Sequence, residues 1–169
     1  ALAGAGDAAG HDLVVLLSGP EPQRSRLEAI LREQVRSAPG RILFLLGKPE
    51  GPADWREKGR IREVAHLPAE ELNDVLRSAR LVISRPGYST LLDLSALGKR
   101  ALFIPTPGQT EQIYLGERMQ KKGWCIVRRQ SEVNLAVDVP EALHLPGLPL
   151  RPPANPTAFL ADWLERIGF

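Results

Sequence analysis

Apolar and polar positions divide the chain from residue 12 onward into alternating strand-like and helix-like segments. Short apolar or alternating runs rich in Val, Ile and Leu predict strands, and they cover residues 12–19, 41–48, 61–67, 80–85, 100–107 and 124–129. Apolar residues at every third or fourth position predict helices, at residues 25–35, 68–79, 89–98, 110–123 and 155–168. The alternation predicts an α/β fold: a doubly wound, Rossmann-like parallel sheet with helices on both faces.

Three segments fit neither pattern. Residues 47–55 are rich in Gly and Pro and predict a loop. Residues 130–154 are rich in Pro and Leu without a clear period, and we expect them to wander over the surface. Residues 1–11 are mostly small and predict a flexible linker or a chain edge, which leaves residues 12–169 as the domain. We therefore expect one domain of a longer protein.

Composition narrows the classes of function. The 169 residues suffice for about one domain, and 22 basic against 20 acidic residues give a net charge of only +2. This charge provides no broad footprint for nucleic acid. The single Cys125 excludes an internal disulfide and favours a reducing compartment, so we expect a cytoplasmic protein, or one peripheral at the inner face of the membrane at full length. No apolar run approaches the ~20 residues of a membrane span. The three histidines lack metal-ligand spacing, so no metal or cofactor is expected.

Four loops that follow predicted strands share Gly, Pro, hydroxyl or amide residues: SGPEPQR, HLPAEE, SRPGYST and PTPGQTEQ. In doubly wound sheets, ligands bind beyond the carboxyl ends of the strands, near the switch in strand order. The shared composition of these loops therefore predicts a binding edge.

The loop SRPGYST opens a helix. A helix that starts at Ser89 or Thr90 presents unpaired N–H groups and the positive end of its dipole, and Gly87 lets a ligand approach the backbone. A diphosphate fits such a site. A capping-box-like pair of Thr90 and Asp93, with Gly87 serving the turn, explains the same residues equally well.

Two further loops carry weaker signals. Thr110 is a plausible helix cap that places Glu111 and Gln112 in the first turn, where a carboxylate and an amide suit the hydroxyls of a sugar. The alternative is that Glu111 favours the helix dipole and Gln112 is solvated. Ser18 and Gly19 offer backbone amides to a phosphate, but their loop lacks the triphosphate and dinucleotide fingerprints.

The order of these pieces carries a resemblance. The segment ISRPGYSTLLDLSALGKRALFIPTPGQTEQIYLGERMQKKGWCIV resembles the carboxyl-terminal, donor-binding domain of GT-B glycosyltransferases and is most similar to glycosyltransferase family 28. In that family a strand ends in an Arg-x-Gly turn, a Ser/Thr-bearing helix start receives the diphosphate, and an acid one turn later binds the ribose. A Pro-x-x-x-x-x-(Asp/Glu)-Gln segment reaches the donor sugar. The resemblance is specific over residues 80–127 and extends in topology over residues 12–127.

The resemblance implies which residues form the donor site. The diphosphate turn corresponds to Arg85, Gly87, Ser89 and Thr90, and the acid that binds the ribose corresponds to Asp93. The pair that binds the sugar corresponds to Glu111 and Gln112. The first glycine turn corresponds to Ser18 and Gly19, and the loop beside the base to His66 and Leu67. The chain departs from the family in four places. Asp93 replaces a longer glutamate, Gly116 replaces an asparagine, and Pro86 and Tyr88 are bulkier than usual.

The activity that the resemblance implies is hexosyl transfer from a nucleotide sugar, with UDP as the expected nucleotide. Transfer would invert the anomeric carbon without a metal. The acceptor domain and the general base would belong to a missing amino-terminal domain, so the chain alone would bind nucleotide weakly and be inactive. A GT-B-fold sugar-nucleotide hydrolase or epimerase, or a non-catalytic Rossmann-like interaction module, fits the same residues.

Overall fold

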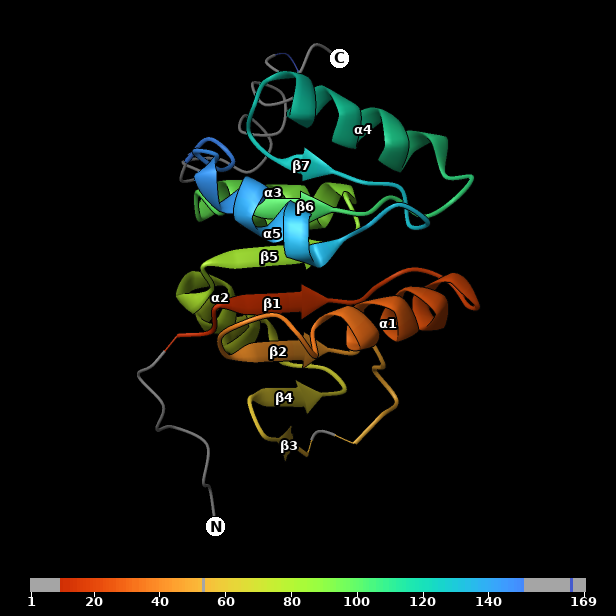
Figure 1. The fold of residues 1–169 in the computed structure, drawn as a ribbon, viewed down its shortest axis with the longest axis vertical. Coiled ribbons are helices and arrows are strands. Elements are labelled where there is room, and N and C mark those ends of the chain that lie inside the picture. Colours follow the sequence, from red (N-terminus) through yellow and green to blue (C-terminus); the bar gives the residue numbers. More distant parts are fainter. Residues whose placement is uncertain (1–9, 53, 151–164, 166–169) are drawn as a thin grey trace.

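The computed structural model describes residues 10–52, 54–150 and 165, which form one seven-stranded sheet between two layers of helices (Figure 1). The strands are β1 (Leu13–Leu16), β2 (Ile42–Leu45), β3 (Arg56–Lys58), β4 (Ile61–Val64), β5 (Leu81–Ser84), β6 (Ala101–Phe103) and β7 (Ile126–Val127). The helices are α1 (Gln23–Gln34), α2 (Ala69–Ser78), α3 (Tyr88–Ala96), α4 (Thr110–Lys121) and α5 (Leu135–His144).

The order of the strands confirms the doubly wound fold. The sheet runs β3-β4-β2-β1-β5-β6-β7, and every pairing is parallel except that of β3 with β4. The chain moves outward from β1 through β2 to β4, returns to β5 beside β1, and then moves outward on the other side. The strand order therefore reverses between β1 and β5, which is where such sheets bind ligands.

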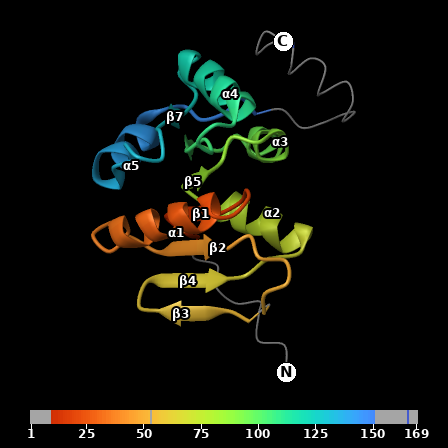
Figure 2. The same cartoon turned by 90° about the vertical axis from the view of Figure 1, so that its right-hand side faces the viewer.

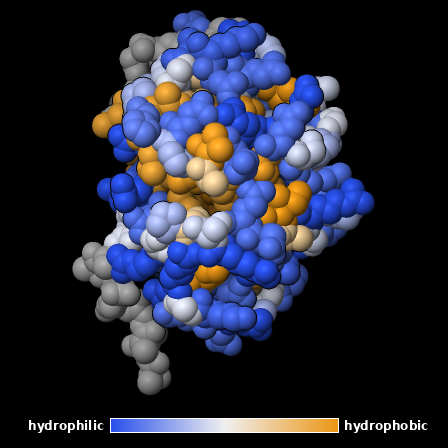
Figure 3. Space-filling view, viewed as in Figure 1, coloured by the Kyte–Doolittle hydropathy of each residue, from blue (hydrophilic) through white to orange (hydrophobic). Residues whose placement is uncertain are grey.

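Helices cover both faces of the sheet, which explains the continuously apolar strands. Successive side chains of a strand point to opposite faces. Leu13 and Val15 of β1 belong to the core cluster that includes residues of α1 and α5, whereas Val14 belongs to the cluster with residues of α2, α3 and α4. Figure 2 shows α1 and α5 on one side of the sheet and α2 and α3 on the other. On the face that carries α1 and α5, hydrophilic residues border an apolar area in the middle (Figure 3).

The expectation of irregular chain at residues 130–154 is wrong, because Leu135–His144 form α5. Leu135, Val139 and Ala142 are buried at helical spacing, but Pro140 lies inside the helix and hides the period in the sequence. Asn134 caps the start of this helix. Its side chain accepts a hydrogen bond from the backbone N–H of Ala136, as an N-cap residue does.

Strand β3 is the second element that the pattern does not predict. Its residues are charged and exposed, and it pairs only as an antiparallel edge next to β4. An edge strand without an apolar face leaves no hydrophobic signal. The helix predicted at residues 155–168 and most of the linker predicted at residues 1–11 lie outside the described residues. Within the described ranges, every helix is too short or too polar to span a bilayer.

Candidate functional site

The carboxyl ends of β1, β5 and β6 meet at one edge of the sheet. Gly19, in the turn after β1, has a φ of 95° that favours glycine. A Cβ placed on Gly19 would lie 3.5 Å from Oγ1 of Thr106, which follows β6. The first glycine turn and the β6–α4 loop are therefore neighbours, as the predicted binding edge requires.

Arg85, at the end of β5, lies inside the domain with an exposed fraction of 1%. Its guanidinium donates hydrogen bonds to the backbone carbonyls of Ile104 (2.7 Å), Pro105 (2.9 Å) and Gln23 (3.2 Å), and to Oε1 of Gln130 (2.6 Å). Burial lowers the pKa of Arg85 to about 10, so the side chain is still charged at neutral pH. The structure thus directs Arg85, a residue of the expected diphosphate turn, toward protein acceptors on the β6–α4 loop, the start of α1 and the segment after β7.

Helix α3 starts without a side-chain cap. Its N-cap residue is Gly87, one residue before Tyr88, and no side chain bonds to the first N–H groups. The alternative of a capping box between Thr90 and Asp93 is therefore not realised. The backbone of Gly87 is extended (φ −84°, ψ 155°), a conformation open to any residue, and a Cβ added there would meet nothing within 4 Å. Neither the turn nor the packing requires glycine, and the space over the helix start is open.

The polar side chains of α3 follow this open start. Ser89 is exposed and Thr90 half-buried, and Asp93 lies one turn further along the same helix. Asp93 is exposed as a residue, but nearby protein atoms partly desolvate its carboxyl group and raise its pKa. A carboxylate is thus placed one helical turn from the unpaired N–H groups.

Helix α4 lies beside the turn that leads into α3, since a Cβ on Gly116 of α4 would be 3.6 Å from Cγ of Pro86. Desolvation raises the pKa of the Tyr88 hydroxyl, and the charges of Glu111 and Tyr114 on α4 add to the shift. Gln112 accepts a hydrogen bond through Oε1 from the backbone N–H of Thr106 at 2.8 Å. The expected cap, Thr110, is the first helical residue, and Gln109 is the N-cap.

His66 and Leu67 follow β4 at the same edge, but β2 separates β4 from β1. Both are half-buried, and Nδ1 of His66 is buried without a hydrogen-bond partner in the part of the chain that the structure describes. The structure therefore brings the residues after β1, β5 and β6 together and places these two farther along the edge.

One departure from the family pattern has a packing explanation. A Cβ on Gly116 of α4 would lie 3.3 Å from both methyl groups of Val127 and 3.6 Å from Cγ of Pro86. Glycine at this position lets α4 approach β7 and the β5–α3 turn closely. The bulkier Pro86 and the smaller Gly116 thus compensate each other.

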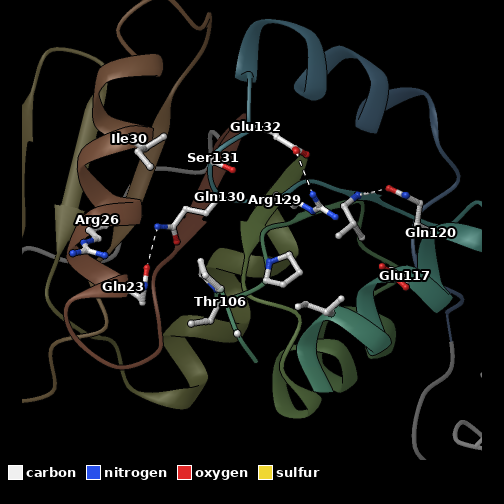
Figure 4. A pocket seen from close by; sticks show the side chains of 15 residues that line it. Gln23, Arg26, Ile30, Thr106, Glu117, Gln120, Arg129, Gln130, Ser131 and Glu132 are labelled. Atoms are coloured by element: carbon white, nitrogen blue, oxygen red, sulfur yellow. Dashed lines mark hydrogen bonds and ion pairs between the residues drawn. The ribbon is translucent and has the colours of Figure 1, made fainter. Parts of the chain in front are cut away.

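A cleft of about 850 Å³ opens on the other side of the β6–α4 loop (Figure 4). Residues from α1, α4, the β6–α4 loop and the segment after β7 line it, among them Gln23, Arg26, Thr106, Glu117 and Gln130. None of the residues expected in the donor site lies in its lining. The sequence offers little signal for this cleft, because the segment after β7 is the one expected to be irregular.

Among the described residues, no group of three or more His, Cys, Asp and Glu side chains could hold a metal ion. The charge-stabilising groups that the site does offer are the N–H groups at the start of α3.

Solved glycosyltransferase structures share this fold. The MurG structure from Acinetobacter baumannii has 16% sequence identity and a TM-score of 0.59, over 95% of this chain and 51% of that one. The glycosyltransferase VinC in complex with DTDP has 16% identity and a TM-score of 0.57, over 95% of this chain and 42% of that one. The architecture is therefore that of one half of a GT-B glycosyltransferase.

The sequence defines the family within this class. Residues 50–148, more than half of the 169, match the sequence model of the glycosyltransferase family 28 C-terminal domain, and the chain belongs to this family. A similar protein is the UDP-N-acetylglucosamine--N-acetylmuramyl-(pentapeptide) pyrophosphoryl-undecaprenol N-acetylglucosamine transferase of Clostridium perfringens, 29% identical over 117 residues. The match covers 68% of this chain and 31% of that protein, so the chain spans about a third of the length of this relative.

Proposed function

We propose that this chain is the donor-binding half of a glycosyltransferase that transfers a sugar from a nucleotide sugar, with UDP as the preferred nucleotide. In the transfer, the acceptor oxygen bonds to the anomeric carbon and inverts it. The bond from that carbon to the diphosphate breaks, and the nucleotide diphosphate leaves with the electron pair. The proton of the acceptor hydroxyl passes to a base outside this chain.

The observation that carries the proposal is the uncapped start of α3. Gly87 has an ordinary backbone conformation and open space where a side chain would be, so the absence of a side chain serves neither the turn nor the core. It leaves room for a ligand against unpaired N–H groups at the positive end of the helix dipole. The site lies at the switch point between β1 and β5, where a diphosphate is expected in this fold.

The other residues take roles around this seat. Ser18 and Gly19 supply the second wall of the diphosphate site, Asp93 accepts hydrogen bonds from the ribose, and Glu111 with the free amide N–H of Gln112 binds the sugar. The loop at His66 and Leu67 flanks the base. The N–H groups stabilise the charge of the leaving diphosphate without a metal.

Arg85 acts indirectly in this proposal. Its guanidinium donates hydrogen bonds to Ile104, Pro105, Gln23 and Gln130, so it fixes the loops that carry the site. We assign it as a positioning residue rather than as a ligand of the diphosphate.

UDP is preferred over dTDP because of Asp93. The similar Clostridium protein is named for UDP-N-acetylglucosamine, whereas the VinC complex contains DTDP. The two nucleotides differ at the 5-methyl group of the base and at the ribose 2′-hydroxyl, and a carboxylate one turn into α3 can accept a hydrogen bond from that hydroxyl. Loss of one hydrogen bond to a charged group lowers affinity by roughly 10-fold or more.

Titration of the ¹⁵N-labelled chain with UDP, UDP-sugars and dTDP tests the proposal. We expect UDP to shift the amide signals of the loops after β1, β4, β5 and β6, and to bind more tightly than dTDP. The double variant Thr90→Ala, Asp93→Asn should weaken UDP binding and keep the fold. UDP shifts outside these loops, or none, would favour a non-catalytic module instead. Product analysis with a longer protein that includes the acceptor domain separates transfer from hydrolysis or epimerisation.

A further inference from the structure

The cleft between α1, α4 and the segment after β7 is lined by none of the residues that the donor site proposed above uses. Its volume of about 850 Å³ lies in the range of small-molecule sites. We infer that this cleft is a saccharide subsite, through which the donor-binding domain itself holds the sugar of the acceptor. The inference rests on the proposed function, because a saccharide in the cleft can be the acceptor only if a nucleotide sugar binds next to the cleft.

The first argument is the orphaned hydroxyl of Thr106. Thr106 lines the cleft with an exposed fraction of 3%, and its Oγ1 is buried without a hydrogen-bond partner among the described residues. A buried polar group without a partner is costly unless a ligand or water completes it. The hydroxyl therefore marks a position at which the cleft is built to receive a polar ligand atom.

The second argument is the charge of the lining. Arg26 on α1 and Glu117 on α4 lie on opposite walls (Figure 4), and neither side chain makes a hydrogen bond or ion pair with other described residues. Arg129 pairs with Glu132 at 3.7 Å within the same lining. Two cations and two carboxylates leave the lining without net charge, so neither a phosphate nor a metal cation matches the lining as a whole. A neutral ligand that carries both hydrogen-bond donors and hydrogen-bond acceptors matches this lining.

The third argument is the mixture of neutral groups. Nε2 of Gln130 donates a hydrogen bond to Oε1 of Gln23 at 3.2 Å, which links two walls of the cleft. Ile30, Ile113 and Val127 supply apolar surface in the same lining. A sugar ring presents hydroxyls at its edges and C–H groups on its faces, and it matches both kinds of surface. The lining therefore fits a saccharide better than a purely apolar chain.

The fourth argument is position. Thr106 is shared between the cleft and the donor edge. Its Oγ1 lies 3.5 Å from the place of a Cβ on Gly19, and its backbone N–H donates to Oε1 of Gln112. Gly19 belongs to the proposed diphosphate site and Gln112 to the proposed sugar pair. A saccharide against Thr106 thus lies next to the bond that the reaction breaks.

Saccharide titration of the 169-residue chain tests the inference, with N-acetylglucosamine and cellobiose as probes and inorganic phosphate as the charged control. We expect saturable, weak binding that shifts the amide signals of Thr106, Gly108, Glu117 and Ser131, no such shifts with phosphate, and the same affinity when UDP is bound. Thr106→Val keeps the shape and removes the hydroxyl, and it should weaken saccharide binding about fivefold. Glu117→Gln should weaken it as well, whereas the matched surface change Glu70→Gln on α2 should not.

The outcomes separate this inference from the proposed function. UDP binding at the strand-end loops with no saccharide shifts in the cleft would overturn the subsite and leave the donor site standing. Saccharide that displaces UDP would also overturn it, because both ligands would share one site. Saccharide binding in the cleft without UDP binding at the edge would refute the donor site and the acceptor role together.

Discussion

The proposed donor edge and the cleft meet at Thr106, and they are built in different ways. The proposed donor edge consists of backbone groups and side chains of short continuous segments, above all the stretch from Gly87 to Asp93. The cleft consists of side chains from α1, α4 and the segment after β7, and its Gln23–Gln130 hydrogen bond joins residues 107 positions apart. The first kind of site leaves a motif in the sequence, whereas the second depends on the fold. Arg85 links the two, since it follows β5 on one side and bonds to Gln23 and Gln130 on the other.

The largest expected effect is that of Arg85→Met. The substitution removes the buried guanidinium and leaves the carbonyls of Ile104 and Pro105 without their donor. We expect the free energy of unfolding to fall by about 3 kcal/mol. We also expect the affinity for UDP at the donor edge and for saccharide in the cleft to be lost. Urea denaturation gives the stability. Arg26→Met is the control, because the Arg26 side chain makes no hydrogen bond or ion pair with other described residues, and it should change stability by less than about 0.5 kcal/mol. Unchanged stability of Arg85→Met with loss of UDP binding would instead make Arg85 a direct ligand.

Gly87→Val separates the two regions. The extended backbone accepts valine and its Cβ meets nothing within 4 Å, so stability should fall only by about 1 kcal/mol, the cost of a poorer N-cap residue. The side chain would occupy the space over the start of α3 and prevent charge-assisted hydrogen bonds to a diphosphate, which corresponds to about a 100-fold loss of UDP affinity. Calorimetry measures this loss. Saccharide binding in the cleft should be unaffected.

A matched glycine change is the control for Gly87→Val. Gly116→Ala puts a Cβ 3.3 Å from Val127 and adds helix propensity, and it leaves the start of α3 untouched, so it should cause no specific loss of UDP affinity. If Gly87→Val binds UDP as well as the unmodified chain, the start of α3 is not the diphosphate site.

The smallest expected effect concerns Asp93 and pH. Desolvation raises the pKa of Asp93 in the folded chain, so its charged form opposes folding. This group contributes most to stability when it is protonated, below its ordinary pKa of 3.8, and the contribution is lost as pH rises through the raised value. Asp93→Asn should therefore be slightly more stable than the unmodified chain at neutral pH, and the difference should vanish in acid. The same substitution should weaken the binding of UDP and reduce the preference of the chain for UDP over dTDP. Thermal unfolding across pH checks the sign, and a less stable Asp93→Asn at neutral pH would contradict it.

The sequence predicts much of the fold because burial on both faces makes strands such as β1 and β5 continuously apolar. It fails at α5, where Pro140 interrupts the helical pattern, and at β3, whose charged residues carry no pattern at all. The same limits apply to function. The turn at Gly87 is readable because its spacing to a helix start is local, but the depth of Arg85 and the orphaned hydroxyl of Thr106 depend on partners distant in sequence.

The most direct test of the central claim is a crystal structure of this chain with UDP. We predict that diphosphate oxygens lie within about 3 Å of backbone nitrogens at the start of α3, with the ribose at Asp93. A diphosphate bound in the cleft beside Gln130, with the start of α3 vacant, would contradict the account.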